Sequence, residues 1–249
     1  MRTLLISDIH ANWPALEAIR EPFDQCLCLG DLVDYGCEPG PVIDWVCKHA
    51  KVCIRGNHDH MVAQNVVTNG IGGFRYLSGV TRGLSRERTT PQQRRYLAGL
   101  PVTQFLNIGG MNVMLVHATP RDPLDEFALP DVEFWKRRIE GLNVDLVCVG
   151  HTHYQYLLDA GRTRILNPGS VGLPRDGDWR AAYAILEFGH ISLHRVEYPV
   201  ERTLAALAAS PLPELAKKSL AELYRTGRLQ NGNHKAKSES AEPANAERG

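Results

Sequence analysis

Residues 3–10 have the sequence TLLISDIH, a short apolar run that ends in Asp8 and His10. The run is typical of a buried strand, and Asp and His are side chains that bind hard or borderline divalent metals. The same arrangement recurs along the chain, with further apolar runs each followed by a polar cluster. These clusters are GDLVDYG (30–36), GNHD (56–59), VHA around His117 and GHTH (150–153). Ligand-type residues at the ends of five strands predict a metal site, because ordinary turns do not select them so consistently.

The composition is that of a soluble globular protein. The chain has 249 residues, of which 43% are hydrophobic and 22% charged, enough for one sizeable core. Lys+Arg and Asp+Glu both number 28, so no global attraction to nucleic acid or to a membrane is expected. No apolar run is long enough for a signal peptide or a membrane span. The six cysteines form no CxxC pair, which favours reduced thiols and a cytoplasmic location.

The first half of the chain alternates predicted strands with helices. The segments 13–23 and 39–50 each carry a proline near the start and apolar residues at helical spacing. Strand–helix–strand repetition predicts a parallel sheet. In the second half, alternating runs surround Gly109-Gly110, Ala160-Gly161 and Gly189, which predicts three hairpins and mostly antiparallel pairing. These patterns together indicate a mixed α/β fold of two packed sheets between helical layers.

The segment 69–100 interrupts the strand series and is predicted to be a helical insertion beside the site. Within it, a short helix is expected with a threonine cap, Pro91 at its start and Gly99 at its end. Two helical runs follow Val200. The last residues, 227–249, contain almost no large apolar side chain and are predicted to be a disordered tail after a single domain of residues 1–226.

Two-metal hydrolysis requires cations roughly 3.5–4 Å apart that share a bridging carboxylate and a bridging water. The clusters supply the number and type of ligands required: Asp8, His10, Asp31, Asn57, His117, His151 and His153. The D-x-H and H-x-H spacings suit strand ends, where residues two apart point the same way. A plainer interpretation remains for single residues. Each Asp could cap a turn, and Asn57 could cap the helix that follows it.

The ordered series D-x-H, GD-x-x-D, GNHD, H and GH-x-H spans residues 8–153 and resembles the calcineurin-like metallophosphoesterase family. The later NPGSVGLPR (167–175) resembles the small bacterial, phosphodiesterase-like branch of that family. The resemblance implies a four-layer α-β-β-α sandwich of two mixed β-sheets flanked by helices. It also implies two divalent metal ions. Mn²⁺ is the first choice because mixed Asp, Asn and His ligation suits a borderline cation, and Fe and Zn fit nearly as well.

The resemblance divides the ligands into two sets that share the carboxylate of Asp31. The first metal is assigned Asp8, His10 and His153. The second metal is assigned Asn57, His117 and His151.

By the same resemblance, His58 lies over the leaving-group oxygen as a general acid or transition-state stabiliser. Asp34 hydrogen-bonds His58 and favours its charged form. Substrate phosphate is expected to contact Asn57, His58 and Arg175. The related Ser/Thr protein phosphatases carry an arginine directly after the residue that matches Asp34, whereas this chain has Tyr35, which makes a phosphoprotein substrate less expected.

These observations predict a binuclear metal-dependent phosphoesterase that hydrolyses phosphodiester or nucleotide-type substrates with a metal-bridging hydroxide. Small phosphorylated metabolites, cleaved as phosphomonoesters, are the second expectation. A third is a metal-bound scaffold of the same fold that has lost catalysis. The completeness of the ligand set, together with His58, argues against the scaffold.

Overall fold

The computed structural model describes residues 1–67 and 70–229, so most of the predicted tail lies outside the described residues. One sheet of five strands has the order β10-β9-β1-β2-β3. Its strands β1, β2 and β3 are parallel, and β9 and β10 continue the sheet in antiparallel pairing. The bounds are β1 (Arg2–Ile6), β2 (Gln25–Cys28), β3 (Ala50–Cys53), β9 (Ala181–Glu187) and β10 (His190–Val196).

The second sheet has the order β4-β5-β6-β8-β7. Its strands are β4 (Thr103–Ile108), β5 (Met111–Val116), β6 (Leu146–Cys148), β7 (Gln155–Ala160) and β8 (Thr163–Pro168). The three predicted hairpins are confirmed as β4–β5, β7–β8 and β9–β10. Pairing in this half of the chain is mostly antiparallel, as predicted, with the parallel neighbours β5–β6 and β6–β8 as exceptions. Helix α6 (Val132–Ile139), which the sequence analysis did not predict, makes the crossover between β5 and β6.

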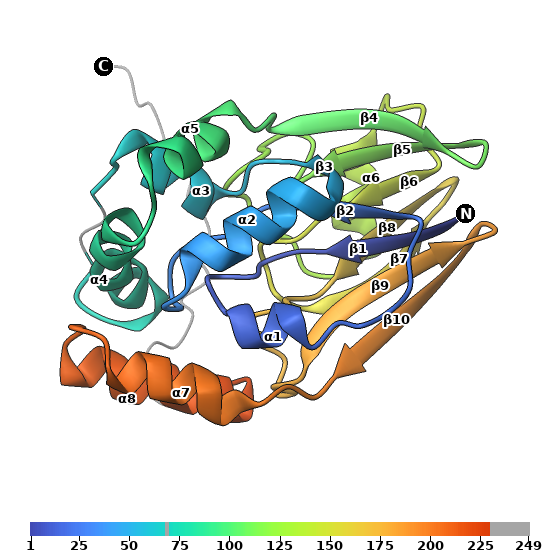
Figure 1. Ribbon diagram of the computed structural model, residues 1–249. Helices are drawn as coiled ribbons and strands as arrows, with labels where there is room; N and C mark the ends of the chain where they lie inside the picture. The colour runs from blue at the N-terminus through green and yellow to red at the C-terminus, as the bar shows by residue number, and fades with distance from the viewer. Residues whose placement is uncertain (68–69, 230–249) are drawn as a thin grey trace, which may run out of the picture.

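Helices cover the outer face of each sheet, which gives the predicted four layers (Figure 1). Helices α1 (Trp13–Glu17) and α2 (Pro39–His49) cover the first sheet, and α6 covers the second. Helix α1 is shorter than predicted and ends at Glu17, with Ala18 as its C-cap. The remaining helices lie toward one end of the sheets: α3 (Asn57–Gln64), α4 (Gly73–Glu87), α5 (Pro91–Gly99), α7 (Val200–Ala208) and α8 (Glu214–Thr226).

The helices α4 and α5 fall inside the 69–100 segment, and α5 has the expected threonine cap. Thr90 accepts a hydrogen bond from the Gln93 N–H, and the Gln93 side chain accepts one from the Thr90 N–H, so two free donors at the helix start are satisfied.

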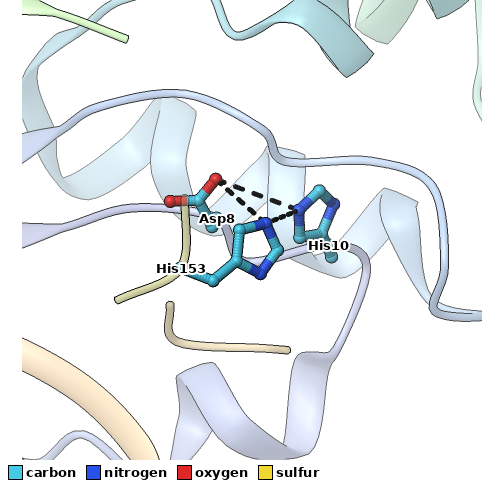
Figure 2. A group of neighbouring side chains, drawn as sticks. All are labelled: Asp8, His10 and His153. Atoms are coloured by element: carbon cyan, nitrogen blue, oxygen red, sulfur yellow. Dashed lines mark hydrogen bonds and ion pairs between the residues drawn. The ribbon is translucent and has the colours of Figure 1, made fainter. Parts of the chain in front are cut away.

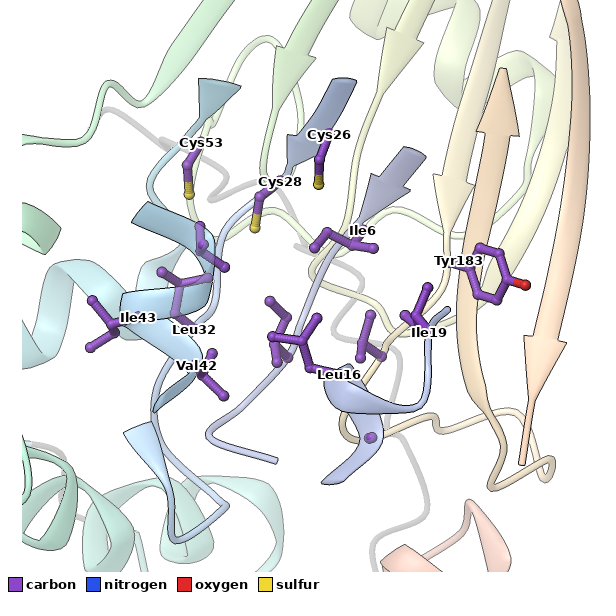
Figure 3. Packing of buried hydrophobic residues seen from close by; sticks show 14 of the residues in the cluster. Ile6, Leu16, Ile19, Cys26, Cys28, Leu32, Val42, Ile43, Cys53 and Tyr183 are labelled. Atoms are coloured by element: carbon purple, nitrogen blue, oxygen red, sulfur yellow. The ribbon is translucent and has the colours of Figure 1, made fainter. Parts of the chain in front are cut away.

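Alternate side chains of the first sheet point to opposite faces and contribute to two separate hydrophobic cores. Leu5 and Leu27 pack between the two sheets, whereas Ile6, Cys26 and Cys28 pack under α1 and α2 (Figure 3). Cys26 and Cys28 therefore face the same side of the sheet. Buried side chains from both sheets pack together, and this packing fixes the position of the loops at the strand ends. No helix in the described part of the chain is long and apolar enough to cross a membrane.

Candidate metal centre

The ligand-type residues lie in loops beyond the strand ends, with backbone angles that a strand does not have. Asp8, His10, Asp31, His151 and His153 have φ values of 52°, 50°, 58°, 63° and 63°. The predicted strand-like alternation of the D-x-H and H-x-H motifs was therefore wrong. Positive φ costs on the order of 1 kcal/mol or more for such residues and persists only where surrounding contacts enforce it. Here the neighbouring loop supplies those contacts, because Asp8 N–H donates to the Gly30 carbonyl and His10 N–H to that of Asp31.

Asp8, His10 and His153 form a buried group (Figure 2). The Nε2 atoms of the two histidines are 3.1 Å apart, and Asp8 Oδ1 lies 3.9 Å from that of His10 and 3.5 Å from that of His153. Each Nδ1–H donates to a backbone carbonyl, that of Val33 or that of Leu173, at 2.8 and 2.5 Å. Burial lowers the pKa of both rings, which keeps them neutral. The Nε2 lone pairs of the two histidines therefore point at one position, where a bound cation would stabilise the arrangement.

A second buried group joins Asp31 and His117 to the same Asp8. His117 Nε2 lies 3.3 Å from Asp31 Oδ2, and this oxygen is also 3.7 Å from His10 Nε2. Asp31 Oδ2 thus lies between the two histidines, as a bridging carboxylate requires. Burial alone would lower the pKa of His117, but the Asp31 carboxylate raises it to about 10. The field at this position therefore favours positive charge.

Asn57, at the start of α3 (Asn57–Gln64), and His151, in the loop after β6, line the same cleft. Asn57 is the first residue of α3, whose N-cap is Gly56, and its buried Oδ1 has no hydrogen-bond partner among the described residues. The side chain does not cap the helix, so the plainer interpretation of Asn57 was wrong. His151 Nε2 lies 3.1 Å from the Asp125 carbonyl oxygen, which leaves Nδ1 as the free ring nitrogen. Burial lowers the pKa of His151 to about 3, so the ring is neutral.

The seven predicted ligands lie close together, because the two buried groups share Asp8, and four of the seven residues line one cleft. Their donors are imidazoles, carboxylates and an amide oxygen. This donor set fits divalent cations. Gly56 and Gly150 let their loops lie close to the carboxylates of Asp31 and Asp8, because a side chain at either position would clash. A Cβ at Gly56 would lie 2.1 Å from Asp31 Oδ1, and one at Gly150 would lie 2.8 Å from Asp8 Oδ2 and 2.0 Å from the hydroxyl of Ser7.

Asp59 holds the loop that carries Asp31. Its buried carboxylate accepts hydrogen bonds from three backbone N–H groups, those of Asp31, Leu32 and Gly56, at 2.8, 2.8 and 3.0 Å. These contacts brace the start of the turn that carries His58 against the loop of Asp31.

Replacing Asp59 by Ala is expected to lower the free energy of unfolding by about 3 kcal/mol or more, because three buried N–H donors lose their acceptor. Denaturant unfolding of the metal-free protein measures this loss. The matched control is Asp159→Ala, which removes an exposed carboxylate from β7 and should change stability by less than about 0.5 kcal/mol. Equal stabilities for the two variants would contradict the bracing role.

His58 and Asp34 form the predicted pair, with His58 Nδ1 2.8 Å from Asp34 Oδ2. The structure adds Arg82 of α4, whose Nη2 and Nε lie 2.6 and 3.1 Å from the same oxygen. Sequence reasoning missed Arg82. It is one of several arginines in the 69–100 segment, and nothing in its spacing distinguishes it from the others.

Arg82→Ala is expected to lower turnover at least tenfold without releasing metal, because Asp34 then loses its fixed orientation and His58 its anchor. Arg82→Lys should retain more activity than Ala, since the charge remains while the two-point contact is lost. The matched control is Arg86→Ala, on the same helix, whose side chain donates to the Val62 carbonyl. Equal turnover in the Arg82 and Arg86 variants would show that Arg82 only supports the fold.

Arg175 lies in the wall of the same cleft. Its guanidinium carbon is 3.8 Å from the ring centroid of Phe74 and 5.8 Å from that of Tyr35. Tyr35 is buried, and its ring lies 4.8 Å from His10 and 5.0 Å from His58. Tyr35 thus packs against the candidate metal centre.

The calcineurin-like phosphoesterase superfamily domain matches residues 1–190. The chain belongs to this family. It is 31% identical to a metallophosphoesterase from Sphaerobacter thermophilus, whose crystal structure superimposes with a TM-score of 0.73 and covers 89% of this chain and 99% of that one. A hypothetical protein from Pyrococcus horikoshii, 22% identical, shares the fold with a TM-score of 0.78 over 88% and 97% of the two chains. An uncharacterized protein of Methanocaldococcus jannaschii is 29% identical over 84% of this chain and 93% of its own length.

Membership in this family makes the chain, at the coarse level, a metal-binding phosphoesterase. The candidate ligand groups found in the structure agree with this, because they consist of residues that hold divalent metals.

Proposed function

We propose that the protein is a binuclear metal-dependent phosphoesterase that hydrolyses phosphodiester or nucleotide-type substrates. The observation that carries the proposal is the position of Asp31 Oδ2, 3.7 Å from His10 Nε2 and 3.3 Å from His117 Nε2. One carboxylate oxygen is thereby shared between two groups of histidines. A single-metal site would not need this arrangement, whereas a pair of cations does.

When bound, two divalent cations would activate a water for attack at phosphorus and neutralise the phosphate oxygens. His10 and His153 would hold the first cation with Asp8, and His117 and His151 the second with Asn57. The protein also supplies His58, whose ring is held in a fixed orientation. Because Asp34 engages Nδ1 of His58, Nε2 is the ring nitrogen left for a substrate oxygen. His58 and Asn57 both line the cleft, where a substrate phosphate would meet them.

Phosphodiesters are favoured over phosphoproteins because Tyr35 and not arginine follows Asp34. Phosphomonoesters of small metabolites remain the second candidate. The non-catalytic scaffold is disfavoured by the contacts that orient His58, since a protein without turnover has no need of a buried Arg82–Asp34–His58 chain. Mn²⁺ is the proposed native metal, ahead of Fe and Zn.

Metal-reconstituted protein should be tested against a substrate panel. Bis(p-nitrophenyl) phosphate is compared with p-nitrophenyl phosphate, and then 2′,3′-cyclic nucleotides with dinucleoside polyphosphates, each with Mn²⁺, Fe²⁺ and Zn²⁺. We expect turnover with Mn²⁺, a preference for the diester, and two metal equivalents per chain by elemental analysis. Absence of turnover with every metal and substrate would favour the scaffold.

A further inference from the structure

The cleft over the candidate metal centre continues into a second hollow. The inner cavity, of about 640 Å³, is lined by Asp31, Asn57 and His58, and the outer one, of about 620 Å³, by Tyr154, Arg228 and Leu229. Phe74, Phe127 and Arg175 line both. A substrate held at the metals can therefore extend past these three side chains into the outer hollow.

Aromatic side chains stand exposed along this path. Phe127 is 53% exposed and Tyr154 is 37% exposed, although each lies close to a candidate ligand. The Phe127 ring is 6.1 Å from that of His151, and Tyr154 directly follows His153 in the chain. Exposed aromatic rings beside a polar site are typical of surfaces that bind a flat apolar group.

Positive side chains accompany these rings. Arg75 lines the inner cavity, Arg228 the outer one, and Arg175 the junction between them. Arg175 Nε is buried without a hydrogen-bond partner among the described residues. The facing carboxylates beyond the candidate ligands are those of Asp125 and Asp176, and Asp176 is already paired with Arg195. The path beyond the metals is thus both aromatic and basic.

We propose that the outer hollow binds the nucleoside part of a nucleotide ester, so that the base stacks on Phe127 or Tyr154 while the reacting phosphate lies at the metals. This inference rests on the proposed function. A base provides the flat ring that the aromatic walls accommodate. Arg175 at the junction suits the negative charge of the phosphate, and Arg228 beyond it can donate hydrogen bonds to oxygen atoms of the sugar or base. Inorganic polyphosphate would leave the aromatic side chains unused, and a purely apolar ester would leave the arginines unpaired.

Two substrates that release the same p-nitrophenol test this proposal. Thymidine 5′-(p-nitrophenyl phosphate) and methyl p-nitrophenyl phosphate differ only in the group that stays on phosphorus. We expect the wild-type protein to prefer the thymidine ester in kcat/KM. Phe127→Ala should lower kcat/KM for that ester about tenfold, since one stacked base is lost. The same variant should leave the methyl ester within about twofold.

The chain offers matched controls. Phe188→Ala removes an 88% exposed phenylalanine from the β9–β10 turn, and should leave both substrates unchanged. Arg228→Ala should weaken the thymidine ester selectively, with Arg162→Ala in the β7–β8 turn as its control. Calorimetric binding of thymidine 5′-monophosphate gives a readout that does not depend on turnover. Its affinity should fall in the Phe127 and Arg228 variants and stay constant in the controls.

The possible outcomes separate the two proposals. If neither ester turns over with any metal, the proposed function fails. If the methyl ester turns over as fast as the thymidine ester, or if Phe127→Ala slows both equally, the nucleoside site is refuted while the phosphoesterase stands.

The nucleotide unit could come from a free nucleotide or from the end of an oligonucleotide. Faster cleavage of dinucleoside polyphosphates than of short oligonucleotides would identify the free nucleotide, and the reverse order the oligonucleotide.

Discussion

Replacing His58 by Ala is expected to lower kcat by about 10²- to 10⁴-fold, the range typical of a lost acid–base group. Metal content should remain unchanged, because His58 Nδ1 is engaged by Asp34 and the ring belongs to neither candidate ligand group. Steady-state kinetics and elemental analysis of the same preparation measure the two effects together. The expected result is therefore a folded, metal-loaded protein with little turnover.

A comparison of substrates with poor and good leaving groups tests the role of His58 more specifically. If His58 protonates or stabilises the departing oxygen, the variant should lose more activity on an alkyl ester than on a p-nitrophenyl ester, which departs without help. His190→Ala, at the exposed start of β10, is the matched control and should retain full activity. Wild-type turnover by the His58 variant, or an equal loss on both esters, would contradict the assigned role.

The candidate ligands could be predicted from the sequence because each lies within a few residues of a strand end that the apolar pattern marks. Strand ends at one edge of a packed pair of sheets have few ways to be arranged, so residues far apart in sequence meet there. The local backbone could not be predicted. Asp8 and His10 sit at positive φ, which tertiary contacts from the Gly30 and Asp31 carbonyls enforce.

Other features depend on packing that no local pattern encodes. Arg82 contacts Asp34 from a helix 48 residues further along the chain. Arg86, on the same helix, contacts the Val62 carbonyl instead. Phe127 lies in an irregular loop, and only the fold places it beside His151. The parallel pairing of β6 was missed because its apolar run fits either strand direction, and the crossover helix α6 was not recognised. A sequence pattern therefore locates donors at strand ends more readily than the side chains that orient them.

Asp31→Ala is expected to abolish both metal binding and turnover, unlike the His58 substitution. Asp31 Oδ2 is the oxygen that lies near both His10 and His117, so its loss weakens both cation positions together. Asp8 belongs to both candidate groups, but its carboxylate is already held by the His151 backbone N–H, so it is not expected to move into the place of Asp31. Elemental analysis after reconstitution should show two metal equivalents in the wild type and fewer than one in the variant.

Asp31→Asn separates metal loss from unfolding, because the amide oxygen can still accept the hydrogen bond that the His58 N–H donates to Asp31 Oδ1 at 2.9 Å. At one hundred times its dissociation constant, a bound metal stabilises the wild type by about 2.7 kcal/mol, and this should appear as a higher Tm. The Asn variant should keep a Tm near that of the metal-free wild type and gain nothing from added Mn²⁺. If it gained as much as the wild type, the two cations would be held without a shared carboxylate and Asp31 would not be the bridge.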